Sequence, residues 1–502
     1  MTAPAVLAAF IFTATVPLND GALAQKRGGT LIVATETGHR GFDAPSAGVI
    51  NGSVAMTMVQ YLFGTDAVTQ EPIPMLGLSM TASKDRKSWT IKTRRGVRFS
   101  DGTPFNAAAV AFNYNRIRAS KCRCRAFIAT IVKVEATDED TVVFHLKHPW
   151  AAFRSAVSGP AIYSYIHSPT AIKKMGDKVY NRNPVGTGPF TMLEWRSGDR
   201  VTVVRNPNYW GKAPYLDKVI FRVIPDTETR YASLLSGDVD AIWTDRANHI
   251  LKARKRSDVV VLRNEGNGAL TIFLNNAKPP LDDVRVRKAM QLAFDTDRFN
   301  KAIRKGVNPT AYHPFGPKFN CPGFQYPKPD LVKARQLIKA YGKPVKVIYT
   351  HTTTARGREG ALISQSFWNK IGVETVMDPV DQTTLIRKVV TGDYQISGWR
   401  IVEEIDPYVD IQIVGTFYSK SPANYAHYKN PMMDKLVLGG RVTENPQKRA
   451  AMYCGVAKLI AAEVPILYRG GLVRHVLTRP DVKGVPVPYG GLINTLAAWL
   501  DR

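Results

Sequence analysis

The chain has 502 residues, 44% of them hydrophobic, which is enough for more than one domain or lobe with its own core. Its 68 Lys and Arg residues exceed its 41 Asp and Glu residues and give a net charge of +27. The basic residues are scattered in short runs, so the composition argues against nucleic-acid binding. It favours a solvated basic surface, and leaves open an anionic ligand or attraction to an anionic membrane surface.

The N-terminus is typical of an export signal. An apolar segment at 3–17 is too short to span a bilayer, and Ala22-Leu23-Ala24 fits the cleavage pattern. The sequence therefore predicts a signal peptide at 1–24 and a mature start at Gln25, although no basic residue precedes the apolar run and the translation start stays open. No later stretch contains 18 uninterrupted apolar residues, so we expect a soluble, exported, periplasmic protein.

Four cysteines are present, Cys122, Cys124, Cys321 and Cys454, and an oxidising compartment permits disulfides between them. The sequence leaves their pairing open. Cys122-Arg123-Cys124 also has the form of a metal pair, but no second pair and no histidine at ligand spacing accompanies it. Disulfides or unpaired thiols are therefore favoured over a metal site.

Strand and helix patterns alternate along the first part of the chain. In chain order they predict a strand at Thr30–Thr35, a helix at 53–63, a strand at Ser88–Thr93, a helix at 107–117 capped by Asn106, a hairpin formed by 131–137 and Thr141–Leu146, and a helix, loop and helix over 153–175. Asp101-Gly102 marks a tight turn between the second strand and its helix.

Residues 183–240 are the segment from which the most secondary structure can be predicted. Strands at 190–194 and 201–205 flank a hairpin loop at 197–199, and a buried apolar strand follows at 219–224. Asp226 or Thr227 can cap the next helix, which Gly237 ends. No set of side chains in this segment is typical of catalysis.

Helices and strands also alternate in the second part of the chain, which indicates α/β packing. The patterns predict an amphipathic helix beginning after Asp282 and Asp283, helices at 331–341, 359–371, 384–390, 432–438 and 448–462, and strands at 345–349, 373–377 and 465–468.

Four segments, in this order, resemble the signatures of one family. They are RRGVRFSDGTPFNAAAVAFNYNRI, NPVGTGPF, RNPNYWGKAPYLDKVIFRVIPDTETRYASLLSGDVDAI and LDDVRVRKAMQLAFDTDRF. The chain is similar over essentially its whole mature length to the bacterial family 5 extracellular solute-binding proteins, the peptide-, nickel- and opine-type binding subunits of ATP-driven importers. The resemblance implies a monomeric protein without cofactor that delivers a solute to the membrane permease of an ABC importer.

The fold implied by the resemblance is α/β: a two-lobe periplasmic-binding-protein fold (type II, cluster C-like) with an extra subdomain inserted in the first lobe. The solute would lie between the lobes. Lobe I would contain 25–59, 181–274 and 478–502, with the subdomain at 60–180, and lobe II would span 275–477. The crossing segments would lie near 274–276 and 474–478.

The resemblance also implies ligand-binding residues. The residues themselves add Trp399, which would offer a flat apolar wall with one N–H donor or lie in the core, and Arg400, which would face a ligand carboxylate or lie on the surface. The remaining candidates are Glu403, Glu404 and Asp406 from the same loop, Phe42, Asn51, Gly52 and Ser53 from the first lobe, and Tyr163 from the inserted subdomain.

The loop after Trp399 departs from the pattern of peptide-binding members. They place an aspartate for the ligand's α-ammonium group three residues before the Asp-Pro pair, where this chain has Glu403, and the loop is one residue longer. The turn near Tyr163 lacks the arginine of nickel-chelate binders, and no histidines form a ligand pair. The ligand stays open between an oligopeptide, an opine-like solute and another small organic solute.

An exported hydrolase acting on peptides or small organic solutes is the alternative function. It would need a nucleophile with its base or paired catalytic carboxylates. The sequence contains neither Gly-x-Ser-x-Gly nor His-Glu-x-x-His, and adjacent Glu403 and Glu404 point apart on an extended chain. We therefore expect a binding protein and not an enzyme.

Overall fold

The computed structural model describes residues 25–47, 52–66, 69, 71–159, 161, 163–315, 319–401, 406, 408–486 and 492–502. The predicted signal peptide and three candidate site residues, Asn51, Glu403 and Glu404, lie outside them. Among the described residues, no helix has the length and apolar character needed to cross a membrane.

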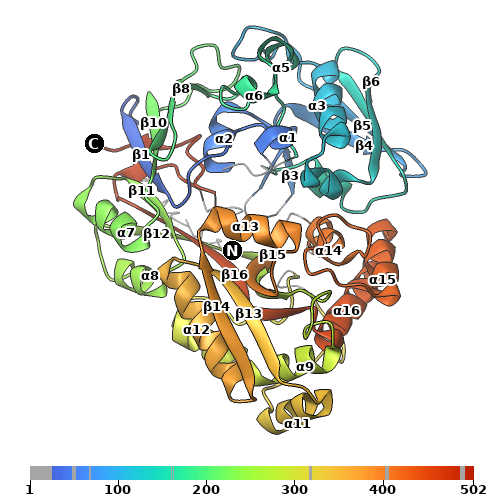
Figure 1. The fold of residues 1–502 in the computed structure, drawn as a ribbon. Coiled ribbons are helices and arrows are strands. Elements are labelled where there is room, and N and C mark those ends of the chain that lie inside the picture. The colour runs from blue at the N-terminus through green and yellow to red at the C-terminus, as the bar shows by residue number, and fades with distance from the viewer. Residues whose placement is uncertain are drawn as a thin grey trace, which may run out of the picture.

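A mixed ten-stranded sheet organises the molecule (Figure 1). Its strands follow the order β14-β13-β15-β12-β16-β11-β1-β10-β9-β8. Their bounds are β1 Thr30–Thr35, β8 Phe190–Arg196, β9 Arg200–Arg205, β10 Lys218–Val223, β11 Ala241–Thr244, β12 Val260–Leu274, β13 Val345–Thr352, β14 Val373–Val380, β15 Ile396–Ile401 and β16 Ile466–Thr478. The elements of the N-terminal half gather around the β8 end, and those of the C-terminal half around the β14 end.

The long antiparallel strands β12 and β16 run through both halves. Near one end, Val260–Glu265 face 473–478, and β16 also pairs there with β11. Near the other, 269–273 face 466–471, and β12 also pairs with β15. The register of β12 is interrupted between Glu265 and Ala269. This change of neighbours falls a few residues before the predicted boundary at 274–276, and the division into lobes stays a prediction.

Local signals explain the elements of the N-terminal half. The side chain of Asp226 accepts from the Thr229 amide to cap α7, and Gly237 ends this helix in the left-handed conformation. The hairpin β8–β9 and the strand β10, parallel to β1, confirm the strands predicted for 183–240, but only Val219 and Phe221 of β10 are buried, so the expectation of a fully buried strand is wrong. The helices here are α1 Ala44–Ala47, α2 Gly52–Met58, α7 Thr227–Ser236 and α8 Ala247–Ala253, and the C-terminal strands β17 Val482–Lys483 and β18 Trp499–Leu500 form a small sheet beside them.

The predicted helix at 53–63 is wrong in its second half. Helix α2 ends at Met58, and Phe63 begins strand β2. The Met58 carbonyl accepts a hydrogen bond of 2.9 Å from the Gly188 amide. This carbonyl therefore bonds to a turn far along the chain instead of to a further turn of the helix. A Cβ on Gly188 would lie 2.4 Å from the Thr57 carbonyl oxygen, so only glycine permits this approach.

A separate antiparallel sheet in the order β4-β5-β7-β6, covered by α3, stands beside the first half (Figure 1). Asn106 caps α3 and β6 pairs with β7, as predicted. The elements of this region are β2 Phe63–Thr65, β3 Pro72–Pro74, β4 Gly77–Ala82, β5 Ser88–Thr93, α3 Ala107–Ala119, the 3₁₀ helix η1 Arg123–Ile128, β6 Ile131–Ala136, β7 Thr141–Leu146, α4 Phe153–Ala156, α5 Pro169–Met175 and α6 Asp177–Tyr180.

Helices cover the sheet of the C-terminal half, and α12 packs on β13 and β14. Their bounds are α9 Val284–Ala293, α10 Thr296–Arg304, α11 Leu331–Tyr341, α12 Ala355–Asn369, α13 Gln382–Thr391, α14 Asp410–Phe417, α15 Pro431–Val442 and α16 Pro446–Glu463. Helix α12 begins earlier than predicted because Thr354 caps it. Figure 1 shows α13 where the two halves meet, opposite α1 and α2.

All four cysteines are oxidised. Cys122 pairs with Cys124, and Cys321 pairs with Cys454 across 133 positions. The pairing that the sequence left open is thereby assigned, and Cys122 and Cys124 are bonded to each other instead of being arranged as a metal pair.

Candidate functional site

A cavity of about 710 Å³ lies where the two halves meet. Its walls come from Arg40 and the end of α1, from η1 and the loop before it, from β11 and the residue after it, and from the C-terminal half. The lining residues from the C-terminal half lie on β12, β13, β15 and β16, on α10, α12, α13 and α14, and at Tyr425. A cavity formed by segments so far apart in the chain is the usual setting for a ligand site between domains.

Trp399 lines this cavity, where the sequence placed an apolar wall. Its partly buried ring lies 5.8 Å from the ring of Phe273 and 5.9 Å, edge to face, from that of Tyr425. These contacts hold the indole in one orientation at the end of β15. Arg400, the next residue, also lines the cavity and is exposed within it.

Asp406 does not line the cavity. Its buried carboxylate lies 2.6 Å from Nη2 of Arg449, and its amide donates to Ser155 Oγ at 3.4 Å. Burial raises the pKa of Asp406, which the charge of Arg449 only partly opposes. The contacts of Asp406 therefore join the region around α4 to α16.

The described candidates from the N-terminal half also lie outside the cavity lining. Phe42 is fully buried and its ring packs edge to face on that of Trp195. A Cβ on Gly52 would lie 2.9 Å from Leu492, and Ser53 Oγ accepts from the Ile493 amide at 3.0 Å.

Tyr163 is likewise buried and outside the lining. Its ring lies 6.1 Å from that of Phe127, which does line the cavity, so Tyr163 stands behind the wall. The ligand roles of all the candidates named from the sequence stay predictions.

An ion cluster that the sequence did not indicate joins the halves at the cavity. Asp245 Oδ2 lies 2.7 Å from Arg356 Nη1 and 3.6 Å from Arg304 Nη1, and Arg356 Nη2 lies 3.2 Å from Glu36. Burial alone would raise the pKa of Asp245, but the two arginines hold it well below its usual range.

Beside this cluster, Arg246 makes two hydrogen bonds, of 2.7 and 3.1 Å, to the carboxylate of Glu359 on α12. Asp245 and Arg246, which follow β11, thus contact charged residues in the first turns of α12 in the C-terminal half.

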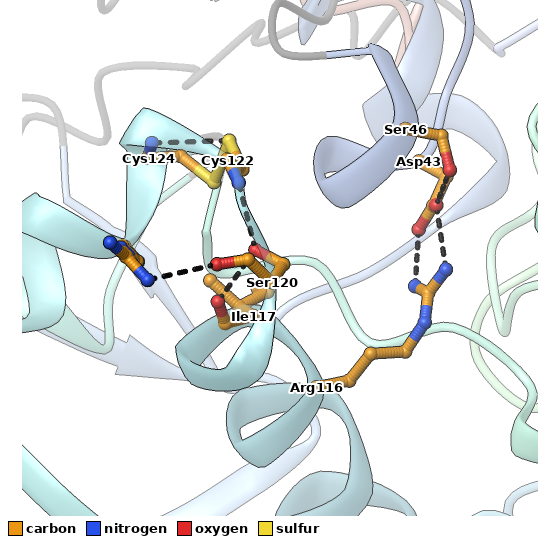
Figure 2. The surroundings of a disulfide bond; sticks show 8 residues. Asp43, Ser46, Arg116, Ile117, Ser120, Cys122 and Cys124 are labelled. Carbon is orange, nitrogen blue, oxygen red and sulfur yellow. Dashed lines mark hydrogen bonds and ion pairs between the residues drawn. A yellow bond between two sulfur atoms is a disulfide. The ribbon is translucent and has the colours of Figure 1, made fainter.

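The Cys122–Cys124 disulfide forms part of the cavity wall. Figure 2 shows it after the end of α3, where the Cys122 amide donates to Ser120 Oγ at 3.3 Å. Nearby on α3, Arg116 binds both carboxylate oxygens of Asp43 at 2.6 and 2.8 Å. This pair ties α3 to the segment that precedes α1.

Within the described residues, no group of three or more His, Cys, Asp or Glu side chains is arranged to hold a metal ion.

The family model for bacterial extracellular solute-binding proteins, family 5 Middle, matches residues 71–424, and the chain belongs to this family. It is 26% identical over 442 residues, 85% of this chain and 84% of the relative, to the Probable D,D-dipeptide-binding periplasmic protein DdpA of Escherichia coli. It is also 26% identical over 431 residues, 83% of each chain, to the glutathione-binding protein GsiB of Shigella dysenteriae.

Among solved structures, the chain resembles the periplasmic binding protein DppA of Helicobacter pylori in complex with the peptide STSA. The TM-score is 0.87 at 23% identity, covering 95% of this chain and 99% of that one. The α/β periplasmic-binding-protein fold expected from the sequence is confirmed. The protein is a periplasmic solute-binding protein, and the hydrolase alternative is not supported.

Proposed function

We propose that the protein is the binding subunit of an ABC importer that captures one solute in the cavity between its halves and presents it, without chemical change, to a membrane permease. The observation that carries the proposal is the 710 Å³ cavity lined from both halves, with Trp399 as one wall. The names of the relatives include dipeptide and glutathione binding, which supports a peptide or a peptide-like small solute.

Closure around the solute is the second part of the proposal. The paired strands β12 and β16 connect the halves, and rotation about their irregular region between Glu265 and Ala269 would open the cavity. Arg246–Glu359 and Arg356–Glu36 would then separate, since each joins the two halves. The protein would act as a monomer without nucleic acid, and the closed form would be the one that the permease recognises.

A panel of several hundred small solutes, screened by thermal shift on the mature protein, tests this function. A solute that binds only the folded state raises the unfolding temperature in proportion to the logarithm of its concentration over its Kd. We expect one group of related solutes to stabilise the protein and to make it more compact by small-angle X-ray scattering. No shift with any solute, or consumption of the binding solute on incubation, would contradict the proposal.

A further inference from the structure

The charge of the cavity lining is strongly one-sided. Among the described residues that line it there is one carboxylate, Asp245, against seven guanidinium groups. The arginines are Arg40, Arg304, Arg356, Arg387, Arg400, Arg469 and Arg474. A solute entering this space meets a positive field that the low-dielectric walls of a cleft concentrate.

The acidic groups near the cavity are already engaged by arginines. Asp245 lies within 4 Å of Arg356 and Arg304, and Glu36 is paired with Arg356. No carboxylate of the described residues that line the cavity is therefore left for the ammonium group of a solute. A cationic or zwitterionic solute would have to compete with an arginine for each of these carboxylates.

Arg400 and Arg469 differ from Arg356 because they have no acidic partner within the described part of the chain. Arg469 Nη2 makes only a long contact of 3.5 Å to the Trp399 carbonyl, and its buried Nε has no acceptor. Arg400 is exposed in the cavity, with no hydrogen bond or ion pair to a described residue. Both side chains are thus free to bind an anion with their planar donor groups.

The two guanidinium groups repel each other and Arg356. Although Arg400 is exposed to the cavity, loss of hydration between the cavity walls lowers its pKa and the charge of Arg356 lowers it further, while Glu36 and Asp245 act in the opposite direction. Burial lowers the pKa of Arg469 as well, with Arg356 again acting in that direction. The arginines of the cavity therefore repel one another, and a bound anion would offset this repulsion.

The two arginines reach the same part of the cavity from different strands. Leu270 of β12 faces Arg400 on one side and Gly470, next to Arg469, on the other. The two arginines therefore begin on strands that flank β12, and the side chain of Arg469 reaches β15, where its Nη2 lies 3.5 Å from the Trp399 carbonyl. Leu270 and Trp399 supply apolar surface in the same cavity.

We propose that the solute of this protein is a small organic molecule with at least two anionic groups, carboxylate or phosphate, one bound by Arg400 and one by Arg469. The proposal rests on the solute-binding function above and names its ligand class. A zwitterionic peptide, bound through an ammonium group at Glu403, is the competing class.

The solute panel, sorted by charge, tests this inference. It includes a matched set of similar size: succinyl-Ala-Ala with two carboxylates, Ala-Ala-Ala with one carboxylate and one ammonium, and Ala-Ala-Ala amide with an ammonium alone. Tricarballylate and 2-phosphoglycerate separate carboxylate from phosphate recognition. We expect the largest shifts from solutes with two or more anionic groups. If zwitterions or cations give the largest shifts, the charge assignment fails while the binding function stands; no shift at all would defeat both.

Single substitutions then locate the anion site. Arg400→Gln and Arg469→Gln should each weaken binding of the best dianionic solute roughly tenfold or more by calorimetry, the loss expected for a hydrogen-bonded charge. Arg358→Gln is the matched control, since Arg358 is exposed on α12 outside the cavity. Thermal unfolding without solute shows whether each variant is folded. Arg400→Gln should leave the unfolding temperature unchanged or raise it. Unchanged affinity in both folded variants, or loss of binding in Glu403→Gln instead, would overturn the assignment.

Discussion

Trp150 Nε1 donates a hydrogen bond of 2.9 Å to Asp410 Oδ2, joining positions 260 residues apart. The fully buried carboxylate of Asp410 also accepts from Arg441 Nε at 3.0 Å and from the Tyr453 hydroxyl. Burial alone would raise the pKa of Asp410, but Arg441, Arg449 and these donors keep it below its usual range. One ionised side chain therefore holds the region after β7 against α14, α15 and α16.

Asp410→Asn should destabilise the protein by about 3–5 kcal/mol, because it leaves the buried Arg441 without a counter-charge. The free energy of unfolding in guanidinium chloride measures the effect. Asp199→Asn is the control: Asp199 is half exposed in its pair with Arg200, so its loss should change that free energy by less than about 1 kcal/mol. Equal changes in the free energy of unfolding for the two substitutions would show that the contacts of Asp410 do not stabilise the fold as proposed.

Two buried histidines should make stability depend on pH. Burial lowers the pKa of His167 and of His475 from 6.5 to about 4. Between pH 6.5 and about 4, these two histidines are protonated in the unfolded chain but remain neutral in the folded state. The stabilisation is therefore complete above pH 6.5 and is lost as pH falls towards 4.

His167→Gln should flatten this pH dependence by about 1.4 kcal/mol per pH unit between pH 6 and 4.5, the value for one proton. Denaturant titrations at several pH values measure the slope, and His148→Gln, which removes a partly exposed ring, is the control. A slope that His167→Gln leaves unaltered would show that His167 takes up its proton in the folded state.

The two disulfides should differ in their effect on stability because they close loops of very different length. Cys321–Cys454 spans 133 positions and Cys122–Cys124 spans 2. Loop-closure entropy predicts a loss of about 5 kcal/mol when both cysteines of the long-range disulfide are replaced by serine, and under about 2 kcal/mol for the short one. Unfolding of the two double variants without reductant measures this, and similar losses would contradict the entropic account.

The absence of a side chain at Gly398 should be required for the position of the Arg469 guanidinium group. A Cβ on Gly398 would lie 3.1 and 3.3 Å from the two terminal nitrogens of Arg469, whereas a Cβ on Gly360 would lie 3.6 Å from the nearer one, an ordinary contact. Gly398→Ala should therefore displace the guanidinium and weaken the best solute of the panel several-fold.

Gly360→Ala is the matched control on the other side of Arg469. Gly360 also lines the cavity, but a Cβ there makes only an ordinary contact with Arg469, so Gly360→Ala should weaken binding less than Gly398→Ala does. It should raise stability by about 0.5–1 kcal/mol, because alanine is preferred to glycine in the interior of a helix. Calorimetry and thermal unfolding of both variants separate the two effects. Equal affinity in Gly398→Ala would place Arg469 outside the binding contacts.

Much of the fold could be predicted because its signals are local. Asp226 and Gly237 mark both ends of α7, and Asn106 marks the start of α3. The full lengths of β12 and β16 could not be predicted. Asn264 and Glu265 interrupt the apolar pattern of β12, and only pairing with β16 along its length keeps these residues in a strand.

The candidate site divides in the same way. Trp399 and Arg400 are neighbours in β15, and the sequence analysis named both as candidates. Arg304, Arg356 and Arg469 belong to α10, α12 and β16. Nothing in the local sequence of these three distinguishes them from the many surface arginines of a basic chain.

The amino-acid sequence by itself determined the alternation of helices and strands, because caps, turns and apolar periods act over a few residues, and its four signature segments indicated the family. The tertiary structure alone decided which cysteines pair, where the halves meet and which arginines share one cavity. These features depend on contacts between segments separated by tens to hundreds of residues, such as Asp245 with Arg356, and the free energy of such contacts exists only once the chain has folded.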